Sequence, residues 1–316
     1  MKAAGFIDLH THGAGGFDTR TKDPGHILNI AELHGMAGTG AILPTIYPAP
    51  IKEIRNNIKA VKTAIEIQRA AGGGEKTHSS PSLPGRRREI NGESCVTHRA
   101  ALILGVHLEG PFLNRARCGA LDGESFLQPS ISALDRILDG YEDIVRIIVI
   151  APEIPGALEV IEKCARSGIR VNMGHSNATY EEATEGKKAG ARGITHIFNA
   201  MRPFHHREPG IAGLGLVDED LYIEVIADGV HLHPGTLALL FYRKRLDRII
   251  LVSDSVRSGQ QKSVPLCKAK GILAGSGITI SDSAAVLRHA GIPHAAFIEA
   301  AIDNPLRYLQ NDASSL

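Results

Sequence analysis

The sequence predicts a single α/β domain built as a (β/α)₈ barrel, and three observations lead to this fold. The length of 316 residues suits a barrel of about 250 residues with insertions. Eight apolar runs of strand length are mostly continuous rather than alternating, as expected for strands buried on both faces of a parallel sheet. Helical patterns separate many of these runs. A doubly wound open sheet is the competing architecture, but no GxGxxG motif follows the first run.

The eight predicted strands can be placed in chain order. They are Gly5–His10, Ala41–Tyr47, Leu102–Glu109, Val145–Ala151, Arg170–His175, Gly193–Asn199, Tyr222–Asp228 and Arg248–Asp254. In a barrel the carboxyl ends of all strands form one rim, and active sites of such barrels lie at that rim.

Helical periodicity between the strands is clearest at Ile51–Ala70 and Pro155–Ser167. A third helix is predicted over Thr179–Ala189, with Thr179 as the N-cap whose hydroxyl accepts from free backbone N–H groups. The last segment, 284–310, is predicted to form one or two closing helices.

The segment Ala71–Arg99 fits no element of the barrel. It is rich in Gly, Ser, Pro and Arg, which predicts a mobile surface insertion between the second helix and the third strand. The run of Arg86, Arg87 and Arg88 could contact phosphate, although a solvated loop is the simpler interpretation. We therefore expect residues 1–316 to form one domain that carries this insertion.

Composition narrows the class of protein. A formal net charge of +1 gives no electrostatic case for binding nucleic acid or an anionic membrane. Because no apolar run of about 20 residues and no signal-peptide pattern is present, we expect a cytoplasmic protein. The four cysteines show no CxxC spacing, which favours reduced thiols. The 15 histidines are the unusual feature, since several stand where strands end.

Imidazoles and carboxylates follow the predicted carboxyl ends of five strands. They are His10, His12, Glu109, His175, His196 and Asp254. Residues two apart in a strand point the same way, so His10 and His12 can face one point. A set of N and O ligands that leaves one position open is what a catalytic divalent metal requires. A histidine at a strand end is by itself more often a hydrogen-bonded core residue, but five strands with such residues at one rim favour a metal site.

The metal-site hypothesis is most specific for Glu109. A buried unpaired carboxylate is costly, so Glu109 needs a cation or a metal as its partner. His107, two residues earlier, is interpreted as a core residue one layer below Glu109 that orients it.

Taken together, these motifs resemble the N-acetylglucosamine-6-phosphate deacetylase family of the amidohydrolase superfamily. The motifs are HxH after the first strand, HLEGPF after the third, GHSNA after the fifth, THIFNAM and REPG after the sixth, ADGVH after the seventh and the aspartate of the eighth. The set is specific, and the resemblance runs from about Phe6 to Asn304. It implies a TIM barrel of the metal-dependent amidohydrolase type.

The resemblance implies a role for each residue that matches a family motif. Glu109, His175 and His196 match the main metal ligands. His10 and His12 match the additional pair of members with two metals. The implied cofactor is a divalent metal, zinc or iron, with one or two ions per chain.

Other matched positions concern catalysis and the substrate. Asp254 matches the catalytic carboxylate, and Asn199 and Ala200 match a backbone segment that contacts the sugar phosphate. His231 matches a substrate-contacting histidine. Arg207 matches an arginine that reaches the phosphate bound by a neighbouring subunit, which implies a homodimer.

The chain departs from the family pattern in three places. The family carries a small β-sandwich built from both chain ends, which we expect to be missing or much reduced here. Leu121 stands where relatives place a histidine that helps polarise the acetyl carbonyl. The region after Asp254 matches poorly.

The resemblance implies hydrolysis of the N-acetyl group of N-acetylglucosamine 6-phosphate to glucosamine 6-phosphate and acetate, a step of amino-sugar catabolism. Another amidohydrolase activity, on a different N-acyl sugar, a cyclic amide or an N-acyl amino acid, is the alternative. Arg207 and His231 favour a phosphorylated ligand, whereas His205 and His206 are interpreted as solvent-exposed loop residues. A barrel that binds sugar phosphate without turnover would require a lost ligand or base, and none is lost.

Overall fold

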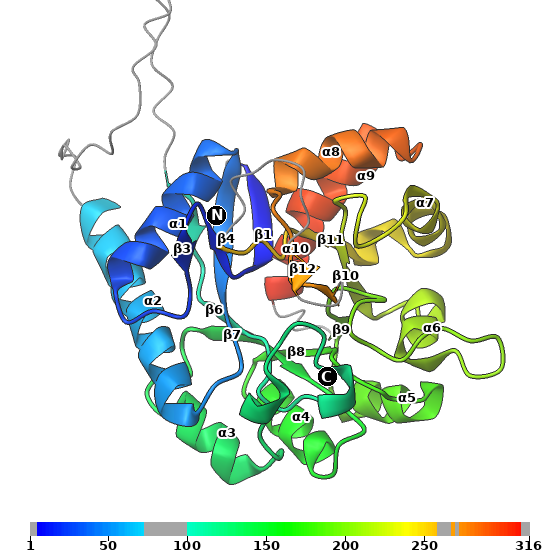
Figure 1. Cartoon of the computed structure of the whole chain (residues 1–316), viewed down its shortest axis with the longest axis horizontal. Helices are drawn as coiled ribbons and strands as arrows, with labels where there is room; N and C mark the ends of the chain where they lie inside the picture. Colours follow the sequence, from blue (N-terminus) through cyan, green and yellow to red (C-terminus); the bar gives the residue numbers. More distant parts are fainter. Residues whose placement is uncertain (1–4, 73–99, 258–266, 269–271, 311–316) are drawn as a thin grey trace, which may run out of the picture.

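The computed structural model describes residues 5–72, 100–257, 267–268 and 272–310, which form a ring of parallel strands surrounded by helices (Figure 1). The predicted insertion lies outside the described residues except for Ala71 and Gly72, which end helix α2. The Arg86–Arg88 run is outside them as well. In the described part of the chain, no helix combines the length and apolarity that crossing a membrane requires.

Parallel strands make the barrel, each hydrogen-bonded to the next. Their order is β1 (Phe6–Thr11), β4 (Thr39–Ile46), β6 (Val106–Leu108), β7 (Val145–Ile150), β8 (Arg170–Met173), β9 (Gly193–Ile194), β10 (Tyr222–Ile226) and β11 (Ile249–Val252). The ring closes between its ends, because Asp254 N–H donates to His10 O at 2.9 Å and His12 N–H donates to Ser255 O at 2.8 Å. This confirms the predicted (β/α)₈ barrel.

Helices connect the strands and cover the outside of the ring (Figure 1). They are α1 (Pro24–Met36), α2 (Ile51–Gly72), α3 (Ile131–Leu138), α4 (Ala157–Arg166), α5 (Tyr180–Ala189), α6 (Gly210–Val217), α7 (Pro234–Arg243), α8 (Ile280–His289), α9 (His294–Ile298), a π-helical turn (Glu299–Asp303) and α10 (Asn304–Leu309). The predicted cap of α5 is confirmed. Thr179 accepts from Glu182 N–H, and the Glu182 side chain accepts from Thr179 N–H, which completes a capping box.

Three apolar clusters stabilise the described part of the fold. The largest lies between strands and helices, the second fills the barrel interior with side chains such as Ile7, Leu9 and Ile250, and a small third cluster contains Leu113, Phe126 and Val149. Tyr308 of α10 belongs to the interior cluster and is 1% exposed. Because Arg170 at the start of β8 donates to Tyr308 O at 2.7 Å, α10 lies at the amino ends of the strands. The opposite end is left for the functional site.

Six of the predicted strands differ from the structure by at most two residues at either end, and the other two differ more. The run Leu102–Glu109 is divided into β5 (Leu102–Ile103), which pairs with β4, and β6. The break falls at Gly105, whose φ of 146° suits glycine and whose position would bring a Cβ within 2.4 Å of Ile144 O. The run Gly193–Asn199 is a strand only at Gly193–Ile194, because the chain then turns with His196 and Phe198 in left-handed conformations.

Two antiparallel pairs of short strands lie outside the barrel sheet. They are β2 (Gly13–Ala14) with β3 (Phe17–Asp18), and β12 (Cys267–Lys268) with β13 (Ile272–Leu273). The first belongs to the loop after β1, and the second follows β11 in sequence. Residues of both pairs line the pocket described next.

Candidate active site

A pocket of about 580 Å³ opens at the carboxyl ends of the strands, a size suited to a small-molecule ligand. Four of the five predicted metal ligands line its floor, and the fifth, His10, is fully buried. His12 and Glu109 directly follow β1 and β6. His175 and His196 each lie two residues beyond β8 and β9. The expectation that these side chains converge is therefore met by the geometry.

Glu109, His175 and His196 form the tightest group. Glu109 Oε1 lies 3.1 Å from Nε2 of both histidines, and the two nitrogens are 3.2 Å apart. All three residues are at most 4% exposed.

His10, His12 and Asp254 form a second group beside the first. The Nε2 atoms of His10 and His12 are 3.3 Å apart, and each lies 3.6 Å from Asp254 Oδ1. Glu109 joins the two groups, because its other oxygen, Oε2, is 3.1 Å from His12 Nε2. One carboxylate thus faces both sets of imidazoles.

Hydrogen bonds behind three of the rings determine which nitrogen faces the pocket. His12 Nδ1 faces Thr45 O at 3.0 Å, and His175 Nδ1 faces Arg117 O at 3.0 Å. His10 Nδ1 faces the carboxylate of Glu224 at 3.3 Å. Because carbonyls and carboxylates only accept, each Nδ1 carries a proton, and in the neutral ring the lone pair of Nε2 is then directed at the pocket, where it can bind a cation.

This arrangement fits a divalent cation. The Nε2 atoms of His10 and His12, and those of His175 and His196, lie 3.2–3.3 Å apart, so a shared positive charge between them, a proton or a metal ion, stabilises each pair. Nitrogen and oxygen ligands at 2.0–2.2 Å from a tetrahedral metal are themselves about 3.3–3.6 Å apart, slightly more than the 3.1–3.3 Å separations of the atoms here. Within each group, the ligand atoms lie within 4.8 Å of one another. The residues present therefore suit a divalent metal.

The two carboxylates of the floor, those of Glu109 and Asp254, have pKa values shifted in opposite directions. Burial alone would raise the pKa of Glu109, but His12, His175 and His196 hold the pKa of this carboxyl well below its usual range. Burial, and next the neighbouring charge of Glu109, raise the pKa of Asp254 to about 7. One carboxylate is thus kept charged, and the other is poised to exchange a proton.

Backbone strain accompanies three of these residues. His175, His196 and Asp254 have φ angles of 46°, 26° and 47°, in the left-handed region. Such conformations cost about 1–3 kcal/mol each in non-glycine residues and gather at functional sites. The local sequence does not favour these turns, so the surrounding barrel must impose them.

The walls of the pocket include most of the predicted substrate contacts. Asn199 and Ala200 line it, as does His231. The ring of His231 is oriented by Asp228, whose Oδ2 lies 2.7 Å from Nδ1. Leu121 also lines the pocket, at the position where the family resemblance expected a histidine.

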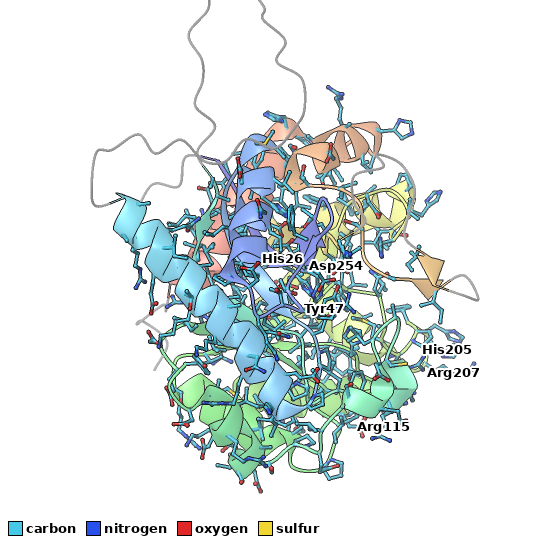
Figure 2. All side chains as sticks on the ribbon, turned by 60° about the vertical axis from the view of Figure 1, so that its left-hand side comes forward. His26, Tyr47, Arg115, His205, Arg207 and Asp254 are labelled. Atoms are coloured by element: carbon cyan, nitrogen blue, oxygen red, sulfur yellow. The ribbon has the colours of Figure 1, made fainter. Side chains whose placement is uncertain are left out.

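Arg207 is placed differently. It is exposed and does not line this pocket. Its Nη1 lies 3.1 Å from His206 Nε2, and its N–H faces His205 Nδ1 at 3.2 Å. Figure 2 shows His205 and Arg207 projecting at the edge of the molecule, away from Asp254. Both His205 and His206 are exposed, as expected.

The interpretation of His107 needs correction. It is fully buried as expected, but it packs against His10, with ring centroids 4.6 Å apart, and its Nδ1 faces Leu9 O at 2.8 Å. Among the described contacts none joins its side chain to Glu109 by a hydrogen bond. His107 is thus a buried core residue, as predicted, but the groups its ring contacts are His10 and Leu9 O rather than the Glu109 carboxylate.

Sequence reasoning missed several groups at the pocket. Tyr47 stacks on His12 with centroids 3.8 Å apart, and Arg20 lies 4.4 Å over the Tyr47 ring while pairing with Asp18 at 2.6 Å. Arg257 also lines the pocket. Tyr47 directly follows β4, so its strand-end position was a usable signal. No local pattern marked the two arginines.

Glu224 was missed as well. It lies in β10 and is 1% exposed. The signal was present in the sequence: a single carboxylate within the apolar strand YIEVI.

Comparisons with known proteins agree with this geometry. The chain is 32% identical over 324 aligned residues to N-acetylgalactosamine-6-phosphate deacetylase of Escherichia coli O157:H7, covering 97% of this chain and 78% of that protein. It is 32% identical over 254 residues to N-acetylglucosamine-6-phosphate deacetylase of Bacillus subtilis, covering 80% of this chain and 58% of the relative. The chain thus spans less than two thirds of the length of the latter enzyme. No family model matches the chain.

Solved structures of N-acetylglucosamine-6-phosphate deacetylases superpose on this chain. N-acetyl-D-glucosamine-6-phosphate deacetylase from Mycobacterium smegmatis, as a variant in complex with N-acetyl-D-glucosamine-6-phosphate, superposes with a TM-score of 0.80 at 27% identity. That alignment covers 97% of this chain and 77% of the other. The corresponding enzyme from Thermotoga maritima gives a TM-score of 0.80 at 26% identity, covering 97% and 78%.

Proposed function

This chain belongs to the N-acetylglucosamine-6-phosphate deacetylase family, and from that we propose that it hydrolyses N-acetylglucosamine 6-phosphate to glucosamine 6-phosphate and acetate. The observation that carries the proposal is the floor of the pocket. There Glu109 faces two groups of imidazoles, and Asp254 lies 3.6 Å from the nearer group. The barrel, residues 1–316 with the insertion at 71–99, is proposed to act as one catalytic domain.

Glu109, His175 and His196 are proposed to hold the main metal ion, and His10 and His12 a second ion. The support is the convergence of Nε2 atoms on a carboxylate whose two oxygens face different groups. Zinc or iron suits this set of nitrogen and oxygen ligands. Such a cation supplies Lewis acidity, which polarises an amide carbonyl and lowers the pKa of a water molecule.

Asp254 is the proposed proton shuttle. A water molecule adds to the carbonyl carbon of the acetyl group while one of its protons passes to a carboxylate oxygen of Asp254. The C–N bond then breaks, and Asp254 returns that proton to the nitrogen. The remaining acid proton passes to the amine, so that the products are an ammonium sugar and acetate. A carboxyl whose pKa lies near 7 is suited to both directions of transfer.

The pocket walls are proposed to orient the sugar. Asn199 and Ala200 line the pocket beside the floor, and so does His231, whose Nδ1 is held by Asp228. Because Arg207 lies outside its own pocket, we propose that it reaches the phosphate bound by a second copy in a homodimer.

A second substrate has specific support. The relative whose length the chain covers to 78% acts on N-acetylgalactosamine 6-phosphate, which differs only in the configuration at C4. The same floor would serve both sugars, since the acetyl group is common to them. Other N-acyl compounds remain the more distant alternative.

Acetate release from four sugars tests the proposal. N-acetylglucosamine 6-phosphate, N-acetylgalactosamine 6-phosphate and their unphosphorylated parents should be compared by kcat/KM, with Asp254→Asn protein as the control for contaminating activity. We expect the 6-phosphates to be preferred and the glucose configuration to be the better of the two. Preference for N-acetylgalactosamine 6-phosphate would identify the second substrate, and no release from any sugar would contradict the activity.

A further inference from the structure

We propose that Glu224 is a positioning residue that holds His10 as a metal ligand and thereby sets the affinity of the second ion. The inference rests on the proposed function only in taking His10 and His12 as ligands. Glu224 touches neither the pocket nor the proposed reacting groups, and it acts through the His10 ring alone.

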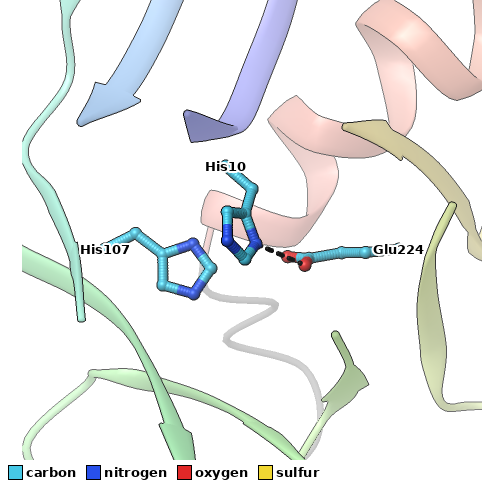
Figure 3. A group of neighbouring side chains, drawn as sticks. All are labelled: His10, His107 and Glu224. Carbon is cyan, nitrogen blue, oxygen red and sulfur yellow. Dashed lines mark hydrogen bonds and ion pairs between the residues drawn. The ribbon is translucent and has the colours of Figure 1, made fainter. Parts of the chain in front are cut away.

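The contact is direct and buried. Glu224 Oε2 lies 3.3 Å from His10 Nδ1, and the two residues are 1% and 0% exposed (Figure 3). On β10, Tyr222, Glu224 and Ile226 share the face that points into the barrel, and both neighbours belong to the interior apolar cluster. A carboxylate in such a place needs partners on every oxygen.

Those partners are present and fix the position of the carboxylate. Thr195 donates to Oε2 at 2.5 Å, and Asn172 donates to Oε1 at 2.7 Å. Asn172 is held in turn by the hydroxyl of Tyr308. The chain of contacts therefore runs from α10, through β8 and β10, to the ring of His10.

The contacts that orient the rings of His10, His12 and His175 differ in charge. His12 and His175 are oriented by main-chain carbonyls, those of Thr45 and Arg117. His10 alone is oriented by a charged side chain. A carboxylate behind a ligating imidazole fixes its tautomer, and its charge raises the basicity of the ligand nitrogen more than a neutral carbonyl does. The ion bound by His10 and His12 should therefore depend on Glu224, and the ion bound by Glu109, His175 and His196 should not.

A different use of the same residues is that His10, His107 and Glu224 bind an ion themselves, since their ligand atoms lie within 4.8 Å of one another (Figure 3). The contacts disfavour this use. Both Glu224 oxygens already accept hydrogen bonds, and His107 presents Nδ1 to Leu9 O at 2.8 Å. The trio is also at most 1% exposed, which leaves no entry path among the described residues.

The test measures metal affinity without substrate, so that it is independent of the deacetylase activity. Metal-free wild type and Glu224→Gln are titrated with zinc against a chromogenic chelator. Loss of an outer-shell partner of a ligand typically weakens metal binding about 10–100-fold. We expect this loss of affinity for the ion at His10 and His12, and an unchanged affinity for the ion at Glu109, His175 and His196. Tyr308→Phe removes the hydrogen bond to Asn172 at the far end of these contacts and keeps the carboxylate, so it should weaken the second ion less than Glu224→Gln does.

A double-mutant cycle separates positioning from general damage to the fold. If Glu224 acts through His10, Glu224→Gln should have no further effect on zinc affinity in a His10→Ala background. Thr195→Val keeps the carboxylate but removes a hydroxyl that lies 2.5 Å from Glu224 Oε2 and 3.4 Å from His10 Nδ1. It should weaken the second ion relative to wild type, and this comparison serves if Glu224→Gln does not fold.

Three results would overturn the proposal. The first is a wild type that binds a single ion, and the second is a Glu224→Gln protein that binds both ions as tightly as wild type. The third is a third ion per chain that disappears in Glu224→Gln while the first two remain.

Discussion

His196 at the floor of the pocket and His206 at the exposed periphery of the molecule, outside the pocket, lie ten residues apart in the chain, yet their surroundings are opposite. His196 is 3% exposed, has a left-handed backbone and faces Glu109 at 3.1 Å. His206 is exposed, and its contact is with the equally exposed Arg207. At the floor, the low dielectric constant and the fixed geometry strengthen the electrostatic interaction between each pair of charges. At the periphery, solvent screens the same residue types, so they gain importance only if something covers them.

The largest effect should come from the carboxylate at the centre of the floor. Glu109→Gln removes the charge that both imidazole groups share, so metal and activity should be lost together. Since the Lewis acidity of a metal is worth several kcal/mol, we expect kcat/KM to fall by about 10³-fold or more. The measurement pairs elemental analysis with acetate release. Full metal occupancy in the variant would show that Glu109 is not a metal ligand and would contradict the proposed metal site.

Asp254 should separate proton transfer from metal binding. Asp254→Asn keeps the shape of the side chain but cannot accept the proton, so kcat should fall by about 10²–10⁴-fold with KM little changed. Most of the metal at Glu109, His175 and His196 should remain, as determined by elemental analysis. Turnover close to that of wild type would remove Asp254 from the mechanism.

Arg207 tests whether the periphery is covered by a second subunit. Arg207→Ala should lower kcat/KM for the phosphorylated sugar by about 10–100-fold, because a charged hydrogen bond is worth about 1.5–3 kcal/mol. The unphosphorylated parent should be affected much less. Equal losses on both sugars would argue against a phosphate contact.

Mixed subunits sharpen this test. Neither Arg207→Ala nor Asp254→Asn protein is expected to be fully active alone. If Arg207 acts across the dimer, mixing the two should restore sites that carry both groups intact, and activity should rise above the sum of the separate proteins. Activity that stays at that sum would mean that Arg207 does not act on the site of a second subunit.

The smallest effect is expected at His206. Its ring is exposed and lies outside the pocket. His206→Gln should therefore change kcat/KM by less than about twofold, in line with surface substitutions that contribute under 0.5 kcal/mol. A loss as large as that of Arg207→Ala would show that the periphery is covered around both residues.

Much of this site followed from local sequence. In a parallel barrel, the end of each strand lies at the same rim whatever the details of packing, so the positions of Glu109, His175 and His196 after β6, β8 and β9 were enough to predict a common site. The same reasoning anticipated the Thr179 cap, which depends only on neighbouring residues. Substrate roles were a matter of family resemblance, and the geometry adds to them only that Asn199, Ala200 and His231 line one pocket.

What the sequence alone determined is therefore the barrel and the residues that meet at its rim, because strand burial and strand-end position are properties of short segments. The tertiary structure decided the partners across the barrel: that Glu224 of β10 lies behind His10 of β1, that His107 lies under His10 rather than Glu109, and that Arg207 lies outside its own pocket. These contacts join residues 97–214 positions apart, and they depend on the closure of the ring and on the direction of each side chain. Strand periodicity fixes the face of a residue, but it does not fix which residue of another strand stands opposite.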